Sequence, residues 1–232
     1  MIIAKIKPLE EVKAMIKDFK RILNVGCAGC TAICLAGGQK EVDTLNAKLT
    51  LSFKEDIAPP PLIEGFTVER QCESQFLDVL DSMVADYDAL LSMACGAGVQ
   101  FLAERFPAMK VFPAVNTTFV GVNRDIGWYE ERCQCCGECV LAYTGGICPV
   151  TMCAKGLFNG PCGGSQDGHC EVDKNIPCAW VNIYKRLKAQ GRLEQILNVF
   201  PARDWKNQTQ GTFVLEEYQD RYSYKDKEES QK

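Results

Sequence analysis

The sequence RILNVGCAGC, residues 21–30, decides which fold we expect for this chain. Its first six residues form a short apolar run whose length suits one buried strand. Cys27 and Cys30 follow at once, and Gly26 and Gly29 stand beside them. A strand that ends in such a loop is typical of an open parallel sheet, in which ligands bind at the carboxyl ends of the strands. The segment therefore predicts an α/β fold with thiols at its binding edge.

Further apolar runs and helix-like segments alternate after this first strand. The other runs of strand length cover residues 65–70, 89–94 and 110–115. Helical segments are expected at 9–20, 39–53, 73–85 and 99–106. This alternation predicts a parallel sheet with helices on its faces and right-handed crossovers. We therefore expect a small Rossmann-like α/β domain over residues 1–125, with the proline-rich stretch 57–61 as a loop inside it.

The rest of the chain has a different character. Nine of the fourteen cysteines lie between Cys133 and Cys178 among many glycines, and apolar periodicity is lost there. This pattern is typical of a segment that metal organises in place of a large core. A helical pattern returns at 179–190. We therefore predict an irregular cysteine-rich iron–sulfur domain over 126–205 that ends with this helix, and a polar C-terminal tail over 206–232.

Composition and charge narrow the possible functions. The chain has 232 residues, of which 47% are hydrophobic, and its net charge is −4. This charge argues against nucleic-acid binding, which usually needs a basic face. The chain has no run of about 18 apolar residues, so we expect no membrane span. The N-terminus lacks the apolar stretch of a signal peptide, so we expect a cytoplasmic protein whose reduced thiols bind metal rather than form disulfides.

The N-terminal cysteines form the first candidate metal site. Cys72 follows the second predicted strand and Cys95 follows the third, just as Cys27 and Cys30 follow the first. Because the carboxyl ends of parallel strands meet at one edge, we expect these four thiols to lie together. Cys34 is a fifth candidate ligand and the one we expect to be left over. The alternative interpretation is that Cys34 and Cys72 are small buried core residues.

The C-terminal cysteines form the second set of candidate ligands. Cys133, Cys136 and Cys139 have the C-x2-C-x2-C spacing with which a ferredoxin loop holds three corners of a four-iron cluster. Five more candidates follow, namely Cys148, Cys153, Cys162, Cys170 and Cys178. These eight thiolates are enough for two [4Fe-4S] clusters, with Cys135 left over, and the N-terminal site would hold a third cluster.

Zinc and histidine must be weighed beside iron. Zinc also accepts four thiolates, but zinc ribbons usually offer two C-x2-C pairs about 15–20 residues apart. The cysteine triple and the wider spacings here favour iron–sulfur, although zinc at one site stays open. His169 is the sole histidine, and it could replace a ligand, donate a hydrogen bond to a cluster sulfur or lie on the surface. With one histidine, Ser–His or Cys–His catalysis is not expected, and we predict no catalytic residue in this chain.

Several long segments carry a family resemblance. In the C-terminal half they are TGGICPVTMCAKGLFNGPCGGSQDGHCEV at 144–172 and CAWVNIYKRL at 178–187. In the N-terminal half they are VGCAGCTAICLAGG at 25–38, VERQCE at 68–73 and ACGAGVQFLAERFP at 94–107. The first group resembles the C-terminal-type domain of certain methylenetetrahydrofolate reductases. Together the segments resemble the small iron–sulfur or zinc-binding subunit of the acetogen-type enzyme.

The resemblance implies a heteromeric complex. Its larger subunit is a TIM barrel that carries FMN and reduces methylenetetrahydrofolate to methyltetrahydrofolate, so FMN and folate are expected on that partner. The present chain would then pass electrons through its clusters between an external donor complex and the partner's FMN. The alternative is a zinc-binding structural or regulatory subunit of the same reductase, without electron transfer. An independent enzyme using the polar residues 116–118 is disfavoured, because such residues are more often capping or solvated.

Overall fold

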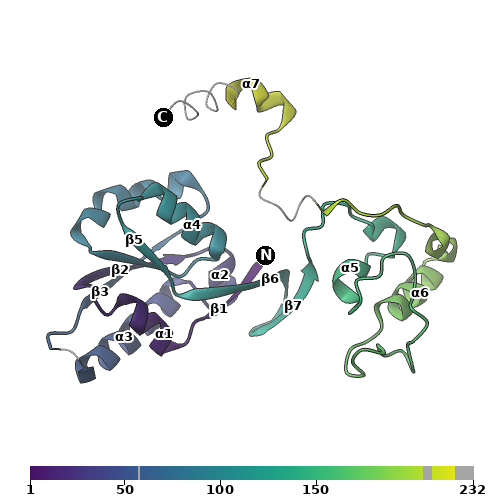
Figure 1. Cartoon of the computed structure of the whole chain (residues 1–232), viewed down its shortest axis with the longest axis horizontal. Helices are drawn as coiled ribbons and strands as arrows, with labels where there is room; N and C mark the ends of the chain where they lie inside the picture. Colours follow the sequence, from purple (N-terminus) through teal and green to yellow (C-terminus); the bar gives the residue numbers. More distant parts are fainter. Residues whose placement is uncertain (57, 206–210, 223–232) are drawn as a thin grey trace. The chain divides into compact units, whose positions relative to one another are not determined.

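The computed structural model describes residues 1–56, 58–205 and 211–222 (Figure 1). The chain divides into two compact units, unit 1 (Met1–Gln134) and unit 2 (Cys135–Lys232). The domain boundary expected at 125/126 falls inside a hairpin formed by β6 (Val115–Asp125) and β7 (Trp128–Cys133). Pairing of β7 with β6 therefore keeps residues 126–134 in unit 1.

Unit 1 contains a four-stranded parallel sheet, which confirms the predicted α/β fold class. In spatial order its strands are β3 (Leu62–Val68), β2 (Arg21–Cys27), β4 (Ala89–Ser92) and β5 (Lys110–Pro113). Each of the four apolar runs in the sequence overlaps one of these strands. The two central strands, β2 and β4, are buried almost throughout, which explains why their sequences are continuously apolar.

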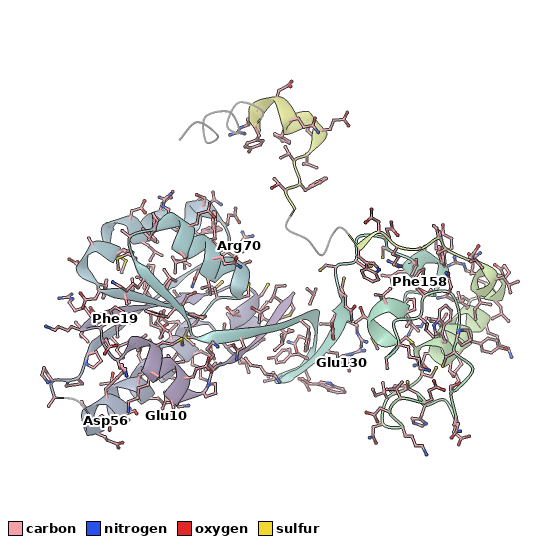
Figure 2. All side chains as sticks on the ribbon, viewed as in Figure 1. Glu10, Phe19, Asp56, Arg70, Glu130 and Phe158 are labelled. Atoms are coloured by element: carbon pink, nitrogen blue, oxygen red, sulfur yellow. The ribbon has the colours of Figure 1, made fainter. Side chains whose placement is uncertain are left out.

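Two hydrophobic clusters pack on this sheet. The first includes side chains from α1 (Leu9–Ile16) and α3 (Gln39–Asp56), and the second includes Leu102 of α4 (Gly96–Arg105). Leu90 and Leu91 are neighbours in β4 but belong to different clusters, because successive strand residues face opposite sides of a sheet. Beside the first cluster, the rings of Phe19 and Phe112 pack with centroids 5.5 Å apart (Figure 2).

The helix expected at 73–85 is wrong in type. The segment forms three short 3-10 helices, η1 (Ser74–Phe76), η2 (Asp78–Ser82) and η3 (Val84–Asp86). Leu77, Leu80 and Val84 are buried in the second cluster. Their spacing of three and four residues therefore reports which side of the segment is buried, and 3-10 turns satisfy it as well as an α-helix does.

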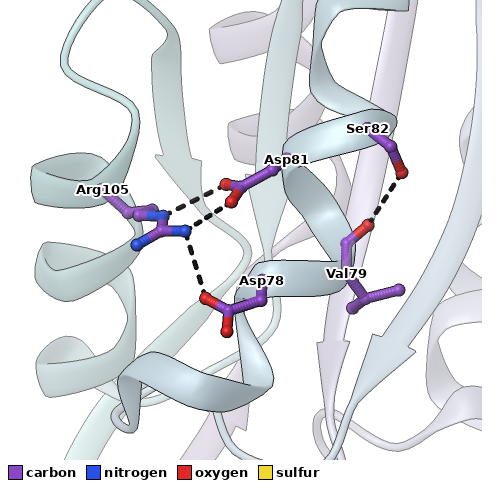
Figure 3. Close-up of polar contacts among 5 residues, drawn as sticks. All are labelled: Asp78, Val79, Asp81, Ser82 and Arg105. Carbon is purple, nitrogen blue, oxygen red and sulfur yellow. Dashed lines mark hydrogen bonds and ion pairs between the residues drawn. The ribbon is translucent and has the colours of Figure 1, made fainter.

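An ion-pair cluster links this segment to the neighbouring helix (Figure 3). Arg105 of α4 donates hydrogen bonds to both Asp81 and Asp78, with 3.1 Å between Arg105 Nη2 and Asp78 Oδ1. Nearby, the Ser82 hydroxyl donates to the Val79 carbonyl. The charged groups are solvent-exposed, so we expect them to fix local geometry rather than to add much stability.

Unit 1 also contains an antiparallel sheet that the sequence analysis did not predict. Its order is β1-β6-β7, where β1 is Ile2–Ile6. The turn between β6 and β7 contains Gly127 at φ +79°, a left-handed conformation that glycine adopts without steric cost. Only two residues of β6, Val115 and Gly121, are buried. The sequence analysis assigned no strand to its short apolar stretch at residues 119–122.

Unit 2 is largely irregular and has little hydrophobic core. Its described elements are η4 (Leu141–Tyr143), α5 (Pro149–Met152), α6 (Ala179–Ala189), η5 (Leu193–Leu197), η7 (Glu216–Tyr218) and α7 (Gln219–Tyr222). The helix predicted at 179–190 is confirmed by α6. Within the described part of this unit, one hydrophobic cluster occurs, and its buried members are Trp180, Ile183 and Leu187.

Two further expectations concern the tail and membranes. Of the polar tail expected at 206–232, residues 206–210 and 223–232 lie outside the described residues, and 211–222 contains η7 and α7. Over the described ranges, no helix combines the length and the apolar character needed to cross a bilayer.

Candidate metal centres

The first four-thiol group lies at the carboxyl edge of the parallel sheet. The chain runs from β2 outward to β3 and then returns to β4 on the other side of β2, so the strand order reverses between β2 and β4. Such a switch point is where open α/β sheets bind ligands. Cys27 ends β2, Cys30 begins the short helix α2 (Cys30–Ile33), and Cys95 is the N-cap of α4. Cys72 follows β3, so three neighbouring strands each deliver at least one thiol.

The electrostatics of Cys72 reflect this grouping. The residue is exposed overall, but partial burial of its thiol raises its pKa above the ordinary value. The charges of Cys27, Cys95 and Cys30 raise the Cys72 pKa further. A thiolate at any of these positions therefore disfavours a thiolate at Cys72.

A glycine lets the backbone come close to one of these thiols. A Cβ atom placed on Gly29 would lie 3.5 Å from Cys27 Sγ and 3.3 Å from Arg70 Cγ. Gly29 therefore leaves the backbone close to the sulfur with no side chain over it. Cys95 lies at the N-terminus of the ten-residue α4, which carries a partial positive charge.

Gln71 connects the loops that carry the four thiols. Its side chain is fully buried, and its Nε2 donates to the carbonyls of Val25 at 2.8 Å and Gly26 at 3.1 Å. Its Oε1 accepts a hydrogen bond from the Ser92 hydroxyl at 2.7 Å. The residue next to Cys72 is thus bound to the ends of both β2 and β4. This buried network fixes the strand ends from which Cys27 and Cys95 project.

Cys34 has a different environment from the other four. It is 6% exposed and belongs to the first hydrophobic cluster. The Ala4 N–H of β1 donates to Cys34 Sγ at 3.4 Å, and burial raises the pKa of the Cys34 thiol. These contacts favour a packing role for Cys34, in line with its expected place as the surplus cysteine. Its membership in the ligand set stays a prediction.

The second four-thiol group lies in unit 2 around one small cavity. The cavity has a volume of about 20 Å³, and Cys153, Cys162, Cys170 and Cys178 all line it. These are the last four cysteines of the chain. The sequence analysis named all four as ligands but could not say which of the eight C-terminal candidates share a centre.

Backbone hydrogen bonds place these four thiols. Cys170 N donates to Ile176 O at 2.9 Å, and Cys178 N donates to Gly168 O at 2.8 Å, so a tight irregular hairpin brings the two cysteines together. Gly164 N donates to Cys162 Sγ at 3.4 Å, which fixes the loop around this sulfur. Cys178 is also the N-cap of the eleven-residue α6, so it lies at the partial positive charge of the helix N-terminus.

Several other side chains line this cavity. Trp180 lines the cavity while its Nε1 donates to Leu157 O at 2.8 Å, which fixes the indole ring. Lys155 and Glu171 also line it and form an ion pair with each other. His169 is exposed and is not among the lining residues, although its backbone pairs with Gln166 and Pro177. Of its three proposed roles, the surface position fits this geometry best.

The remaining C-terminal cysteines are spread along the chain. Cys133 is the last residue of β7 in unit 1, and Cys135, Cys136, Cys139 and Cys148 belong to unit 2. Cys148 is the N-cap of α5. Cys136 Sγ accepts a hydrogen bond from Arg203 Nη1 at 2.9 Å.

The comparison with protein families gives one match. Residues 112–206 match the family described as "Methylene-tetrahydrofolate reductase C terminal". The matched segment includes all nine cysteines of the C-terminal set and stops short of the first four-thiol group. Neither the comparison with curated proteins nor that with solved structures finds a match.

The donor atoms of both four-thiol groups suit iron–sulfur clusters or zinc. Among the residues that the structure describes, no three or more His, Cys, Asp or Glu side chains are arranged closely enough to hold a metal ion. Both groups nevertheless consist of soft sulfur donors, which select zinc and iron–sulfur over magnesium or calcium. The close approach of the Gly29 backbone to Cys27 and the backbone bond to Cys162 also fit a bound group at these places.

Sequence reasoning missed two residues that contact these cysteine loops. Gln71 adjoins Cys72, but a glutamine carries no sequence signal of burial. Arg203 is 67 residues from Cys136, and no spacing rule connects an arginine with a cysteine over that distance. Only the folded chain shows either contact.

Proposed function

We propose that this chain is the iron–sulfur electron-transfer subunit of a methylene-tetrahydrofolate reductase. The proposal is supported above all by where eight cysteines lie: four follow neighbouring strands of the parallel sheet in unit 1, and four line one cavity in unit 2. The family match over residues 112–206 supports the link to this reductase. The partner would be the flavin-containing TIM-barrel subunit, and an external donor complex would supply electrons.

The size of the hydrophobic core supports metal in unit 2. The three buried members of its cluster compare with fifteen and eight in the two clusters of unit 1. Cys153 and Cys178 pack against the small cluster and also line the four-thiol cavity. Metal–thiolate bonds at that place would supply the free energy of folding that so few apolar side chains cannot.

The chain's own residues have definable roles in this function. Cluster iron exchanges single electrons, which suits exchange with a flavin. The cysteine thiolates hold the iron, and the backbone N–H of Gly164 and the N-terminus of α6 stabilise negative charge on sulfur. Trp180 supplies an apolar ring to the lining of the cavity. FMN and folate are expected on the partner, and the protein is expected to act in the cytoplasm.

A zinc-binding structural or regulatory subunit is the second candidate. The same small core in unit 2 favours it, because a structural zinc bound by four cysteines stabilises small domains without any redox role. The two candidates differ in colour, in sulfide content and in redox activity.

Metal analysis of the full chain, purified without oxygen, separates them. Three clusters predict about twelve irons and about twelve acid-labile sulfides per chain, with an electron paramagnetic resonance signal after dithionite reduction. Iron together with one zinc would identify a mixed set of sites. A colourless protein with zinc alone would overturn the electron-transfer proposal and establish the structural one. Electron transfer from the reduced chain to the FMN of a purified reductase subunit then tests the partner.

A further inference from the structure

Arg203 makes a direct contact with one of the candidate cluster ligands. Its Nη1 lies 2.9 Å from Cys136 Sγ and 2.5 Å from the carbonyl oxygen of Glu138. Both acceptors belong to the C-x2-C-x2-C loop. A guanidinium group carries a permanent positive charge, so this bond is charge-assisted when Cys136 is a thiolate.

Neighbouring side chains hold the segment that carries Arg203. The guanidinium carbon lies 4.8 Å from the ring centroid of Phe158, which is labelled in Figure 2. Asn159 exchanges two hydrogen bonds of 2.8 Å with the backbone of Phe200, and the Phe200 ring packs on Tyr143. These contacts hold the residues just before Arg203 in place within unit 2. Arg203 is consequently directed at Cys136 by packing.

The guanidinium group has a further N–H donor that these contacts do not use. Arg203 Nε is buried and has no hydrogen-bond partner among the described residues. Buried donors are almost always paired, so an orphaned one beside a sulfur ligand indicates an acceptor that belongs there. The sulfide and thiolate sulfurs of a metal centre are acceptors of the required charge.

We propose that Arg203 is a positioning residue that donates to the sulfur of Cys136 and raises the reduction potential of the metal centre that Cys136 binds. This inference rests on the proposed iron–sulfur function. Reduction adds one electron, and so one negative charge, to the centre. A fixed cation at hydrogen-bond distance from its ligand stabilises the reduced state more than the oxidised state.

The test compares Arg203→Gln and Arg203→Lys with a matched arginine variant, Arg192→Gln. Arg192 also belongs to unit 2 and donates to a backbone carbonyl, that of Ala142, at 2.9 Å. Cys136→Ala identifies which paramagnetic signal belongs to the centre in question. Each full-length protein is prepared without oxygen, its iron and sulfide are counted, and its signals are followed during a potentiometric titration with dithionite.

We expect Arg203→Gln to keep its iron and to lower the equilibrium constant for reduction of that centre about tenfold, or about 59 mV for one electron. Arg203→Lys should lie between Arg203→Gln and the unaltered chain, because lysine keeps the charge but not the fork geometry. Arg192→Gln should leave the potential unchanged. If Arg203→Gln loses the signal, a lowered potential in Arg203→Lys supports the inference.

Two results overturn the inference in different ways. Equal midpoint potentials in the unaltered chain and in Arg203→Gln, or in Arg203→Lys should Arg203→Gln lose the signal, would overturn the role of Arg203 and leave the proposed function intact. Absence of iron from the unaltered chain would overturn the proposed function and, with it, this inference. Iron counts and potentials are separate readouts, so the two failures are distinguishable.

Discussion

At the scale of single residues, the two four-thiol groups depend on side chains that carry no metal-binding chemistry. Gln71 binds the ends of two strands through its amide, and Gly29 lets the backbone come close to Cys27. The sequence predicted that these thiols follow neighbouring strands of one parallel sheet, because strand ends in such a sheet converge, and their role as metal ligands stays a prediction. It could not predict Gln71, because its role depends on complete burial, which is a property of the fold.

Replacing Gln71 with alanine tests this network. Gln71→Ala removes the acceptor of the buried Ser92 hydroxyl and both hydrogen bonds from the Gln71 amide to the carbonyls of Val25 and Gly26. We expect the free energy of unfolding to fall by about 1–3 kcal/mol and the metal content of the N-terminal site to fall with it. Urea unfolding and metal analysis measure the two effects. Gln39→Ala, which removes an exposed side chain bonded to Asp43, is the control and should change neither.

Substitutions of individual cysteines test the grouping in unit 2. Cys162→Ala removes one of the four thiols around the cavity, and we expect the loss of about four irons per chain. Cys135→Ala removes the cysteine predicted to be surplus, so its iron content should match the unaltered chain. Equal iron contents in the two variants would show that the cavity is not a cluster site. Atomic absorption and sulfide assays on protein prepared without oxygen give the counts.

At the scale of helices and strands, apolar runs predicted the parallel strands well and polar strands not at all. β2 and β4 are buried on both faces, so most of their residues are apolar. β6 is mostly exposed and pairs through backbone hydrogen bonds, which any sequence can make. The segment 73–85 shows a second limit of prediction from sequence. The spacing of its apolar residues reveals which side is buried but does not distinguish an α-helix from 3-10 turns.

Asp88, which directly precedes β4, makes hydrogen bonds to the start of β2 whose strength depends on pH. Its carboxylate accepts the backbone N–H groups of Arg21 at 2.9 Å and Lys20 at 3.0 Å, at the start of β2. These bonds hold the pKa of Asp88 below its ordinary value. A lowered pKa means that the stabilisation is present at neutral pH and is lost as the pH falls through the pKa of the folded state.

The variant Asp88→Asn checks this linkage. We expect it to be less stable than the unaltered chain at pH 7, because an amide is a weaker acceptor, and the difference should shrink at pH 3. Urea midpoints at the two pH values measure the change, with Asp86→Asn in the adjoining turn as the control. A stability difference that does not depend on pH would show that the charge of Asp88 contributes nothing.

At the scale of the whole molecule, the two units are stabilised differently. Unit 1 has a layered α/β core of ordinary size, whereas the described part of unit 2 has a three-residue cluster beside four thiols. Composition and cysteine spacing predicted this contrast. The partition of thiols among centres was beyond sequence reasoning, because hairpin hydrogen bonds such as Cys178 to Gly168 decide which loops meet.

Chelation of the metal should therefore affect the units unequally. We expect amides of α6 to lose protection from hydrogen exchange when metal is removed, because its core is too small to hold the helix alone. Amides of β2 and β4 should stay protected by the two larger clusters. Exchange mass spectrometry of the full chain before and after chelation makes the comparison. An α6 that keeps its protection would show that metal does not stabilise unit 2.

The indole of Trp180 gives unit 2 a built-in optical probe. It lies against the four-thiol cavity in a fixed orientation, and the chain has only two other tryptophans. Loading the cavity with a strongly absorbing iron–sulfur group would quench its fluorescence by energy transfer, whereas colourless zinc would leave the emission bright. The emission lost by Trp180→Phe then isolates this one tryptophan, so occupancy of a single cavity can be followed in real time during reconstitution.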